Sequence, residues 1–112
     1  MNEKEKNFEN AETVDFDTPL RIREPEGDKH FMITFDGKNA TTCGFFNRAI
    51  GRVLDEQFDS SSVFHQIGRE NNPGIHGWEI WGKKDDIMRE KLKSLIPVIV
   101  QKVRELAVEC GK

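Results

Sequence analysis

The chain has 112 residues, of which 36% are hydrophobic and 33% are charged, and its net charge is −3. This length suits one domain with a single core, and the slightly acidic balance argues against a protein that binds polyanions by charge alone. Two cysteines are too few for a disulfide scaffold, and no apolar stretch approaches the roughly 18 residues that a membrane span needs. The first residues also lack the apolar core of a signal peptide. We therefore expect a soluble, intracellular protein with reduced thiols, nuclear in a eukaryote and otherwise cytoplasmic.

The first 19 residues are polar and acidic. They hold six acidic and two basic side chains, a net charge of −4, which leaves +1 for the rest of the chain. Their sizeable apolar side chains are only Phe8, Val14 and Phe16. Such a segment buries too little apolar surface to offset its ordering entropy. We expect residues 1–19 to form a mobile tail and residues 20–112 to form the one domain.

A short strand and a longer strand open the predicted domain. Leu20 and Ile22 alternate with charged residues, which allows a short edge strand. Residues 30–35 alternate apolar and other side chains with a period of two, the pattern of a half-buried strand that Asp36-Gly37 is expected to end.

A helix is predicted from Thr42 to Phe58, where the apolar period changes from two to that of a helix. Thr41 or Thr42 is a suitable N-cap. Gly44 and Gly51 lie seven residues apart on one face, which favours close packing against a neighbouring element. The apolar stripe is broad and consists of Phe45, Phe46, Ala49, Ile50, Val53 and Leu54.

Two more strands and a second helix complete the pattern. Residues 62–67 and 75–81 are predicted to pair antiparallel across a polar turn at residues 69–74. Asp85 or Asp86 can cap the last helix, and Pro97 inside it removes a hydrogen bond at a cost of about 3 kcal/mol, so we expect a kink or a division into two. Its inner stripe is Met88, Leu92, Leu95, Ile99, Val103 and Leu106.

The element order β-α-β-β-α predicts an α+β fold, in which two helices pack on one face of a small antiparallel sheet of three to four strands.

Side chains suited to metal binding or catalysis are few. The three histidines, His30, His65 and His76, and the two cysteines, Cys43 and Cys110, lack the short paired spacings of zinc sites. Cys43 lies near a helix start, where a thiol pKa is lowered, but no motif supplies the base that a nucleophile needs. Phosphate-binding loops are also absent. We therefore expect no metal, no cofactor and no catalytic residue, with a small enzyme as the least favoured class.

Nucleic-acid binding is a weaker alternative. Lys83 and Lys84, with Arg89, Lys91 and Lys93, form a modest basic patch near Trp78 and Trp81. Exposed tryptophans beside bases can stack on single strands, although tryptophans in a strand more often belong to the core. Direct nucleic-acid binding is not the expected function.

The two predicted helices carry more apolar surface than a sheet of three or four strands can cover. Such a surplus favours a protein partner, and the competing interpretation is a broad stripe that is buried within the monomer. On the first interpretation, the stripe residues lie on helix faces directed away from the sheet or across its edge, and they pair with a partner or a second copy.

The region from residue 30 to residue 108 resembles the small α-like subunit of archaeal and nuclear multisubunit RNA polymerases, the family that includes archaeal subunit L. The likeness rests on the order of elements and on Thr42, Gly44 and Arg48, which match a motif at the start of the family's first helix. The chain departs from the family in several places: Ala40-Thr41 stands where an acidic residue and His are expected, Cys43 replaces Leu, Phe45 replaces Asn, and Asn72-Pro73-Gly74 replaces a Pro-His-Pro turn.

The resemblance implies a non-catalytic subunit that forms a heterodimer with a larger α-like subunit during polymerase assembly. The alternative is a small regulatory or inhibitory binding module, such as an accessory or phage protein. The partner interface expected from the helices and the motif comprises Thr42, Gly44, Phe45, Phe46, Arg48, Ile50, Val53, Leu95, Ile99 and Val103.

Overall fold

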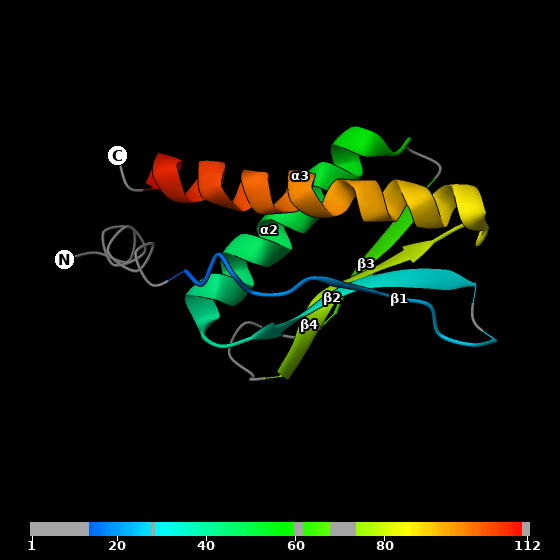
Figure 1. The fold of residues 1–112 in the computed structure, drawn as a ribbon, viewed down its shortest axis with the longest axis horizontal. Helices are drawn as coiled ribbons and strands as arrows, with labels where there is room; N and C mark the ends of the chain where they lie inside the picture. The colour runs from blue at the N-terminus through cyan, green and yellow to red at the C-terminus, as the bar shows by residue number, and fades with distance from the viewer. Residues whose placement is uncertain (1–13, 28, 60–61, 68–73, 111–112) are drawn as a thin grey trace.

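The computed structural model describes residues 14–27, 29–59, 62–67 and 74–110. Its elements are β1 (Arg21–Arg23), β2 (His30–Gly37), α2 (Ala40–Gln57), β3 (Val63–Ile67), β4 (Gly74–Trp81) and α3 (Asp86–Cys110). The strands form one antiparallel sheet in the order β1-β2-β4-β3, and both helices lie on the same side of it (Figure 1). The predicted α+β class is confirmed, with the short edge strand β1 preceding the expected β-α-β-β-α order.

The central strands β2 and β4 decide which side chains face the helices. Successive side chains of a strand point to opposite faces, and the pairing sets Phe31, Ile33 and Phe35 opposite Ile80, Trp78 and His76. These residues form the helix-facing side of the sheet, and all but the half-buried Trp78 are buried. β2 runs two residues past the predicted stop, because Asp36 and Gly37 still pair with Ile75 and Gly74.

Helix α2 begins two residues earlier than predicted, and its N-cap is Asn39 in place of Thr41 or Thr42. The Asn39 Oδ1 accepts the backbone N–H of Thr42 at 2.8 Å. The hydroxyl of Thr42 has a different role, since it accepts the backbone N–H of Asp15 at 3.0 Å. Thr42 therefore ties the segment before β1 to the helix, and it lies inside the helix, three residues after the cap.

Helix α3 begins where Asp85 caps it, because the Asp85 Oδ1 accepts the backbone N–H of Met88 at 2.9 Å. The helix then continues through Pro97 to Cys110, so the predicted division into two helices is wrong. Pro97 lies on the exposed side, while Leu92, Leu95, Ile99 and Val103 are buried on either side of it in the chain. We infer that this burial holds the turns before and after the proline in one helix.

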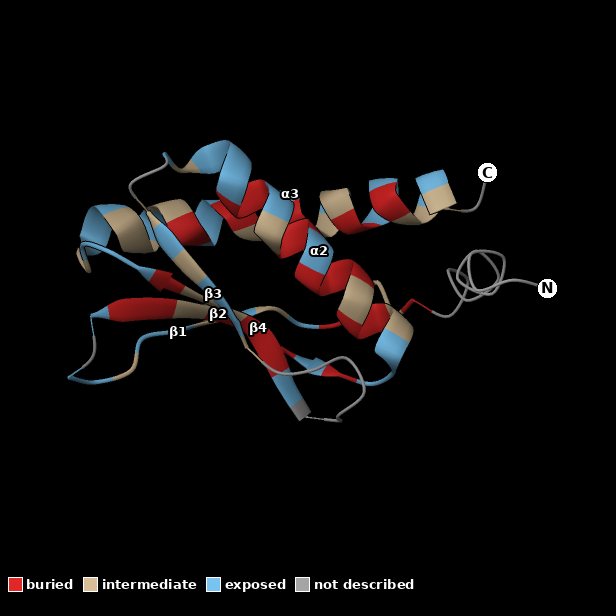
Figure 2. Ribbon diagram, turned by 180° about the vertical axis from the view of Figure 1, so that it is seen from behind, coloured by how far each residue is buried: buried red, intermediate tan, exposed pale blue. Residues whose placement is uncertain are grey.

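Helix α2 packs on two neighbours at once, β4 and β2 on one side and α3 on another. Figure 2 shows buried residues along most of α2. The predicted surplus of apolar helix surface is therefore buried within the chain. The expectation that these helix faces point away from the sheet toward a partner is wrong. Seven residues of the predicted interface are core residues: Phe45, Phe46, Ile50, Val53, Leu95, Ile99 and Val103.

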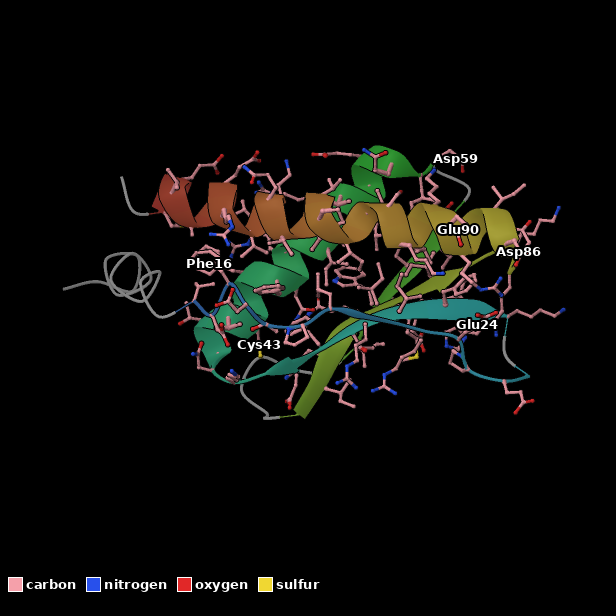
Figure 3. The ribbon with its side chains drawn as sticks, in the orientation of Figure 1. Phe16, Glu24, Cys43, Asp59, Asp86 and Glu90 are labelled. Atoms are coloured by element: carbon pink, nitrogen blue, oxygen red, sulfur yellow. The ribbon has the colours of Figure 1, made fainter. Side chains whose placement is uncertain are left out.

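The segment before β1 also belongs to the domain, contrary to the predicted boundary at residue 20. Val14 and Thr18 are buried. Phe16 lies beneath the C-terminal half of α3 (Figure 3), with the guanidinium carbon of Arg104 5.0 Å from its ring centroid. The apolar content of this segment is small, but each of its bulky groups has a place to pack. Residues 1–13 of the predicted tail lie outside the described residues.

An ion-pair cluster joins the chain after β1 to the first turn of α3. The Arg89 guanidinium donates to both carboxylate oxygens of Glu24, with its Nε 3.0 Å from Oε2, and it also contacts Asp86. Figure 3 shows Glu24 and Asp86 at the same end of the molecule. The hydrogen bond from Arg89 lowers the pKa of the Glu24 carboxyl below its usual value. The cluster is partly exposed, so it serves to orient the loop more than to stabilise the fold.

Two neighbouring residues of α3 provide a matched test of the core assignment. Ile99 is fully buried and Val98 is 41% exposed. Ile99→Glu should lower the free energy of unfolding by about 3–5 kcal/mol, because it buries an unpaired charge, whereas Val98→Glu should change it by no more than about 0.5 kcal/mol. Urea denaturation followed by circular dichroism measures both. Equal effects of the two substitutions would contradict the assignment of this helix face to the core.

Candidate binding surfaces

The residues considered for a metal site do not come together. Among the described residues, no group of three or more His, Cys, Asp or Glu side chains could hold a metal ion. His65 is exposed on β3, and His30 stacks on Trp81 with a ring-centroid separation of 4.5 Å.

Cys43 and His76 lie closer together than the sequence indicates. A Cβ atom added to Gly37 would lie 2.0 Å from the Cys43 Sγ and 3.0 Å from the His76 Cδ2, so both side chains pack against that glycine. Both are also buried almost completely. A thiol and an imidazole enclosed in this way have no surface that a substrate can reach, and we assign them to the core.

The basic side chains of the predicted patch bond to separate neighbouring groups and do not form one continuous basic surface. Lys84 donates to the carbonyl of Pro25, Lys91 donates to the carbonyl of Gln57, and Arg89 bonds Glu24. The two tryptophans lie on opposite faces of the sheet, because they are three residues apart on one strand. The arrangement therefore does not combine the bases with both indoles on one surface.

One face of the sheet has no helix over it among the described residues. It carries three of the large apolar side chains that are exposed in this part of the chain: Val63 at 49%, Ile75 at 55% and Trp81 at 37%. Val63 and Trp81 are direct cross-strand neighbours. We call this the open sheet face, and by pairing register it consists of Arg21, Arg23, His30, Met32, Thr34, Asp36, Val63, His65, Ile67, Ile75, Glu79 and Trp81.

Polar contacts hold the side chains of the open sheet face in place. The Trp81 indole N–H donates to the Glu79 Oε1 at 3.2 Å, and Arg23 Nε donates to the Thr34 hydroxyl at 3.2 Å. A hollow of about 490 Å³ lies at its β1 side, with Arg21, Arg23, Asp36, Lys38 and Ile75 among its lining residues. The charges of the open sheet face are balanced, with two arginines and two carboxylates.

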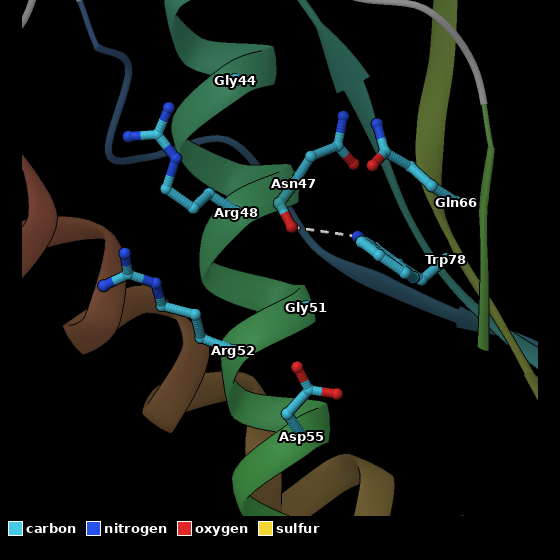
Figure 4. A pocket seen from close by; sticks show the side chains of 8 residues that line it. All are labelled: Gly44, Asn47, Arg48, Gly51, Arg52, Asp55, Gln66 and Trp78. Atoms are coloured by element: carbon cyan, nitrogen blue, oxygen red, sulfur yellow. Dashed lines mark hydrogen bonds between the residues drawn. The ribbon is translucent and has the colours of Figure 1, made fainter. Parts of the chain in front are cut away.

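A second concave surface lies on the helix side of the sheet, between α2 and strands β3 and β4 (Figure 4). Its volume is about 340 Å³, at the small end of the range for ligand pockets. We call it the α2–β3 groove, and its lining residues are Gly44, Asn47, Arg48, Gly51, Arg52, Asp55, Gln66 and Trp78.

Asn47 is the unusual residue of the α2–β3 groove. Its side chain is inside the protein, with the residue only 3% exposed, yet neither its Oδ1 nor its Nδ2 has a hydrogen-bond partner in the part of the chain that the structure describes. Figure 4 shows its amide directed toward the amide of Gln66 on β3. A buried amide without partners costs about 1–3 kcal/mol, so a group with complementary atoms is favoured at this place.

The remaining wall residues shape the groove. The Trp78 indole N–H donates to the backbone carbonyl of Asn47 at 3.0 Å, which fixes the ring against α2. Gly51 permits this approach, because a Cβ there would lie 2.9 Å from the Trp78 Cζ2. The expectation that Gly51 packs closely against the sheet is confirmed.

Of the ten predicted interface residues, only Gly44 and Arg48 line the α2–β3 groove. Thr42 is buried and bonded to Asp15. Sequence reasoning missed Asn47 and Gln66. The available indication was the position of Asn47, a polar residue between the apolar Phe46 and Ala49 in a stretch that was otherwise assigned to a buried stripe.

Comparison with known proteins does not identify the chain: no family model, no curated protein and no solved structure matches it. None of the helices in the described part of the chain is both long enough and apolar enough to cross a membrane.

The contact between Gly51 and Trp78 can be tested by a double substitution. Gly51→Ala should lower the free energy of unfolding, although alanine favours a helix by about 1 kcal/mol over glycine, because the new methyl collides with the indole. In a Trp78→Phe background, which lacks the colliding Cζ2 atom, the same change should be neutral or stabilising. Thermal denaturation of the four proteins measures the coupling. Additive effects would show that the two residues do not touch in solution.

Proposed function

We propose that this chain is a non-catalytic protein-interaction subunit, and that the open sheet face is the surface that binds its partner. The supporting observation is the exposed pair Val63 and Trp81, which are direct cross-strand neighbours, together with Ile75, which is exposed on the same face near the other end of β4, on the side of the sheet away from both helices. Exposed apolar groups that are gathered on one surface favour a partner far more than the same groups scattered singly.

The charges of the open sheet face favour a protein over a polyanion. Arg21 and Arg23 are offset by Asp36 and Glu79, so the face lacks the excess positive charge that nucleic-acid binding requires. An indole surrounded by aliphatic and paired charged groups is typical of the centre of protein interfaces, where tryptophan and arginine carry much of the binding energy.

The resemblance to the small α-like subunit of RNA polymerases supports a narrower form of the proposal, in which the partner is a larger α-like subunit. Its support is the element order and the match at Thr42, Gly44 and Arg48. The apolar helix faces that such pairing would use are inside this chain's core. A polymerase partner would therefore have to contact exposed groups, such as Arg48 on α2 or Val98 on α3.

Affinity purification of the full chain, followed by identification of the bound proteins, tests the proposal. Trp81→Ala and Val63→Glu should each weaken binding of the recovered partner at least tenfold, since truncating a central interface tryptophan costs about 2 kcal/mol or more. Recovery of large polymerase subunits would support the narrower form, and recovery of one unrelated target would support a regulatory module.

Val108→Glu is the matched control, because Val108 is also an exposed apolar residue but lies on α3, away from the open sheet face. It should leave both binding and stability unchanged. Equal retention of the partner by the Val63→Glu and Val108→Glu proteins would remove the open sheet face as the interface. Turnover of a substrate by the purified chain would overturn the non-catalytic assignment.

A further inference from the structure

We infer that the α2–β3 groove binds an extended acidic peptide segment, which adds to the free edge of β3 and bonds the amide of Asn47. This site is separate from the open sheet face, since its strand residues Gln66 and Trp78 point to the helix side of the sheet. The inference does not depend on the proposed use of the open sheet face.

The free edge of β3 favours an extended peptide backbone. In the sheet order β1-β2-β4-β3, strand β3 pairs only with β4, so its outer edge has no strand partner among the described residues. Such an edge presents a row of unpaired N–H and C=O groups, and extended peptides bind by adding a strand to it. The groove lies along this strand and α2, so side chains of an added strand would enter it.

The Asn47 amide gives the groove its polar specificity. An asparagine side chain can donate through Nδ2 and accept through Oδ1 in one plane. Neither atom has a hydrogen-bond partner among the described residues, and Asn47 is one of the residues that line the groove. The carboxamide of an Asn or Gln side chain in the added strand offers the complementary pair, a carbonyl for Nδ2 and an N–H for Oδ1. Gln66 supplies a second amide on the opposite wall (Figure 4).

Two arginines favour an acidic peptide over a neutral or basic one. Arg48 and Arg52 are one helical turn apart at the α2 wall, both are exposed, and neither forms an ion pair with a described residue. The one acidic residue of the lining is Asp55, so the groove has a net positive charge. Guanidinium groups bind carboxylates in a bidentate manner, which suits an Asp or Glu side chain of the added strand.

Selection from a phage-displayed library of random peptides on the immobilised full chain tests the inference. The enriched peptides should carry Asp or Glu at a recurring position. Synthetic labelled copies should bind in fluorescence anisotropy, and proline at alternate positions of the peptide should abolish binding, because proline removes the N–H that pairs with β3.

Two variants of the protein probe the two parts of the groove. Asn47→Leu should weaken peptide binding roughly tenfold, and it should not lower the melting temperature, because it removes a buried amide without partners. The pair Arg48→Glu and Arg52→Glu should weaken binding at least tenfold and reduce its salt dependence. The matched control is Lys83→Glu with Lys93→Glu, which changes the net charge equally at exposed residues outside both the groove and the open sheet face and should leave binding unchanged.

Several results would overturn the inference. One is a selection that enriches no peptide. Another is binding that survives both Asn47→Leu and the reversal of Arg48 and Arg52. Tighter binding of a single-stranded DNA oligonucleotide than of any selected peptide would assign the groove to nucleic acid instead. If Asn47→Leu does not fold, the surface reversals alone decide the outcome, because both arginines are exposed and their loss does not threaten the core.

Discussion

The burial of α2 between the sheet and α3 is the constraint on which the rest of the structure depends. A helix that packs on one neighbour needs one apolar stripe, but a helix that packs on two needs apolar residues around much of its circumference. This is why Phe46, Ile50 and Val53 extend the apolar stripe of α2 beyond one face. The apolar stripe of α3 packs against α2. Each helix thereby buries apolar surface of the other, so the apolar residues of the two helices are covered within the same chain.

The same arrangement leaves the opposite face of the sheet without a covering helix or strand among the described residues. Both described helices lie on one side of the sheet, so neither can cover the other side. Side chains cover part of that face. Arg23 donates a hydrogen bond to Thr34, and the ring of Trp81 stacks on His30. The residual apolar groups, Val63 and Ile75 above all, remain in contact with water. The proposed interface thus follows from the way in which the core is closed.

The α2–β3 groove arises where the packing of α2 is incomplete. Gly51 admits the ring of Trp78, and the ring then bonds the backbone of Asn47, so the helix and β4 are locked together. The side chain of Asn47 is buried on this helix face but has no hydrogen-bond partner among the described residues. Leucine at this position would avoid the cost of an unpaired amide. The presence of asparagine is therefore the feature of this helix that stability does not explain and that ligand binding would explain.

Much of the local structure was determined by the sequence. The alternation at Phe31, Ile33 and Phe35 predicted β2, the helical period predicted α2, and Asp85 was correctly expected among the caps of α3, because these features depend on residues close together in the chain. The short edge strand at Ile22 was also foreseen. Tertiary structure alone decided which neighbour each apolar face would meet, since periodicity shows that a face is buried and not what buries it. For that reason the core of α2 and α3 was mistaken for an interface, Val14 and Phe16 were assigned to a mobile tail, and Asn47 was overlooked until the fold enclosed it.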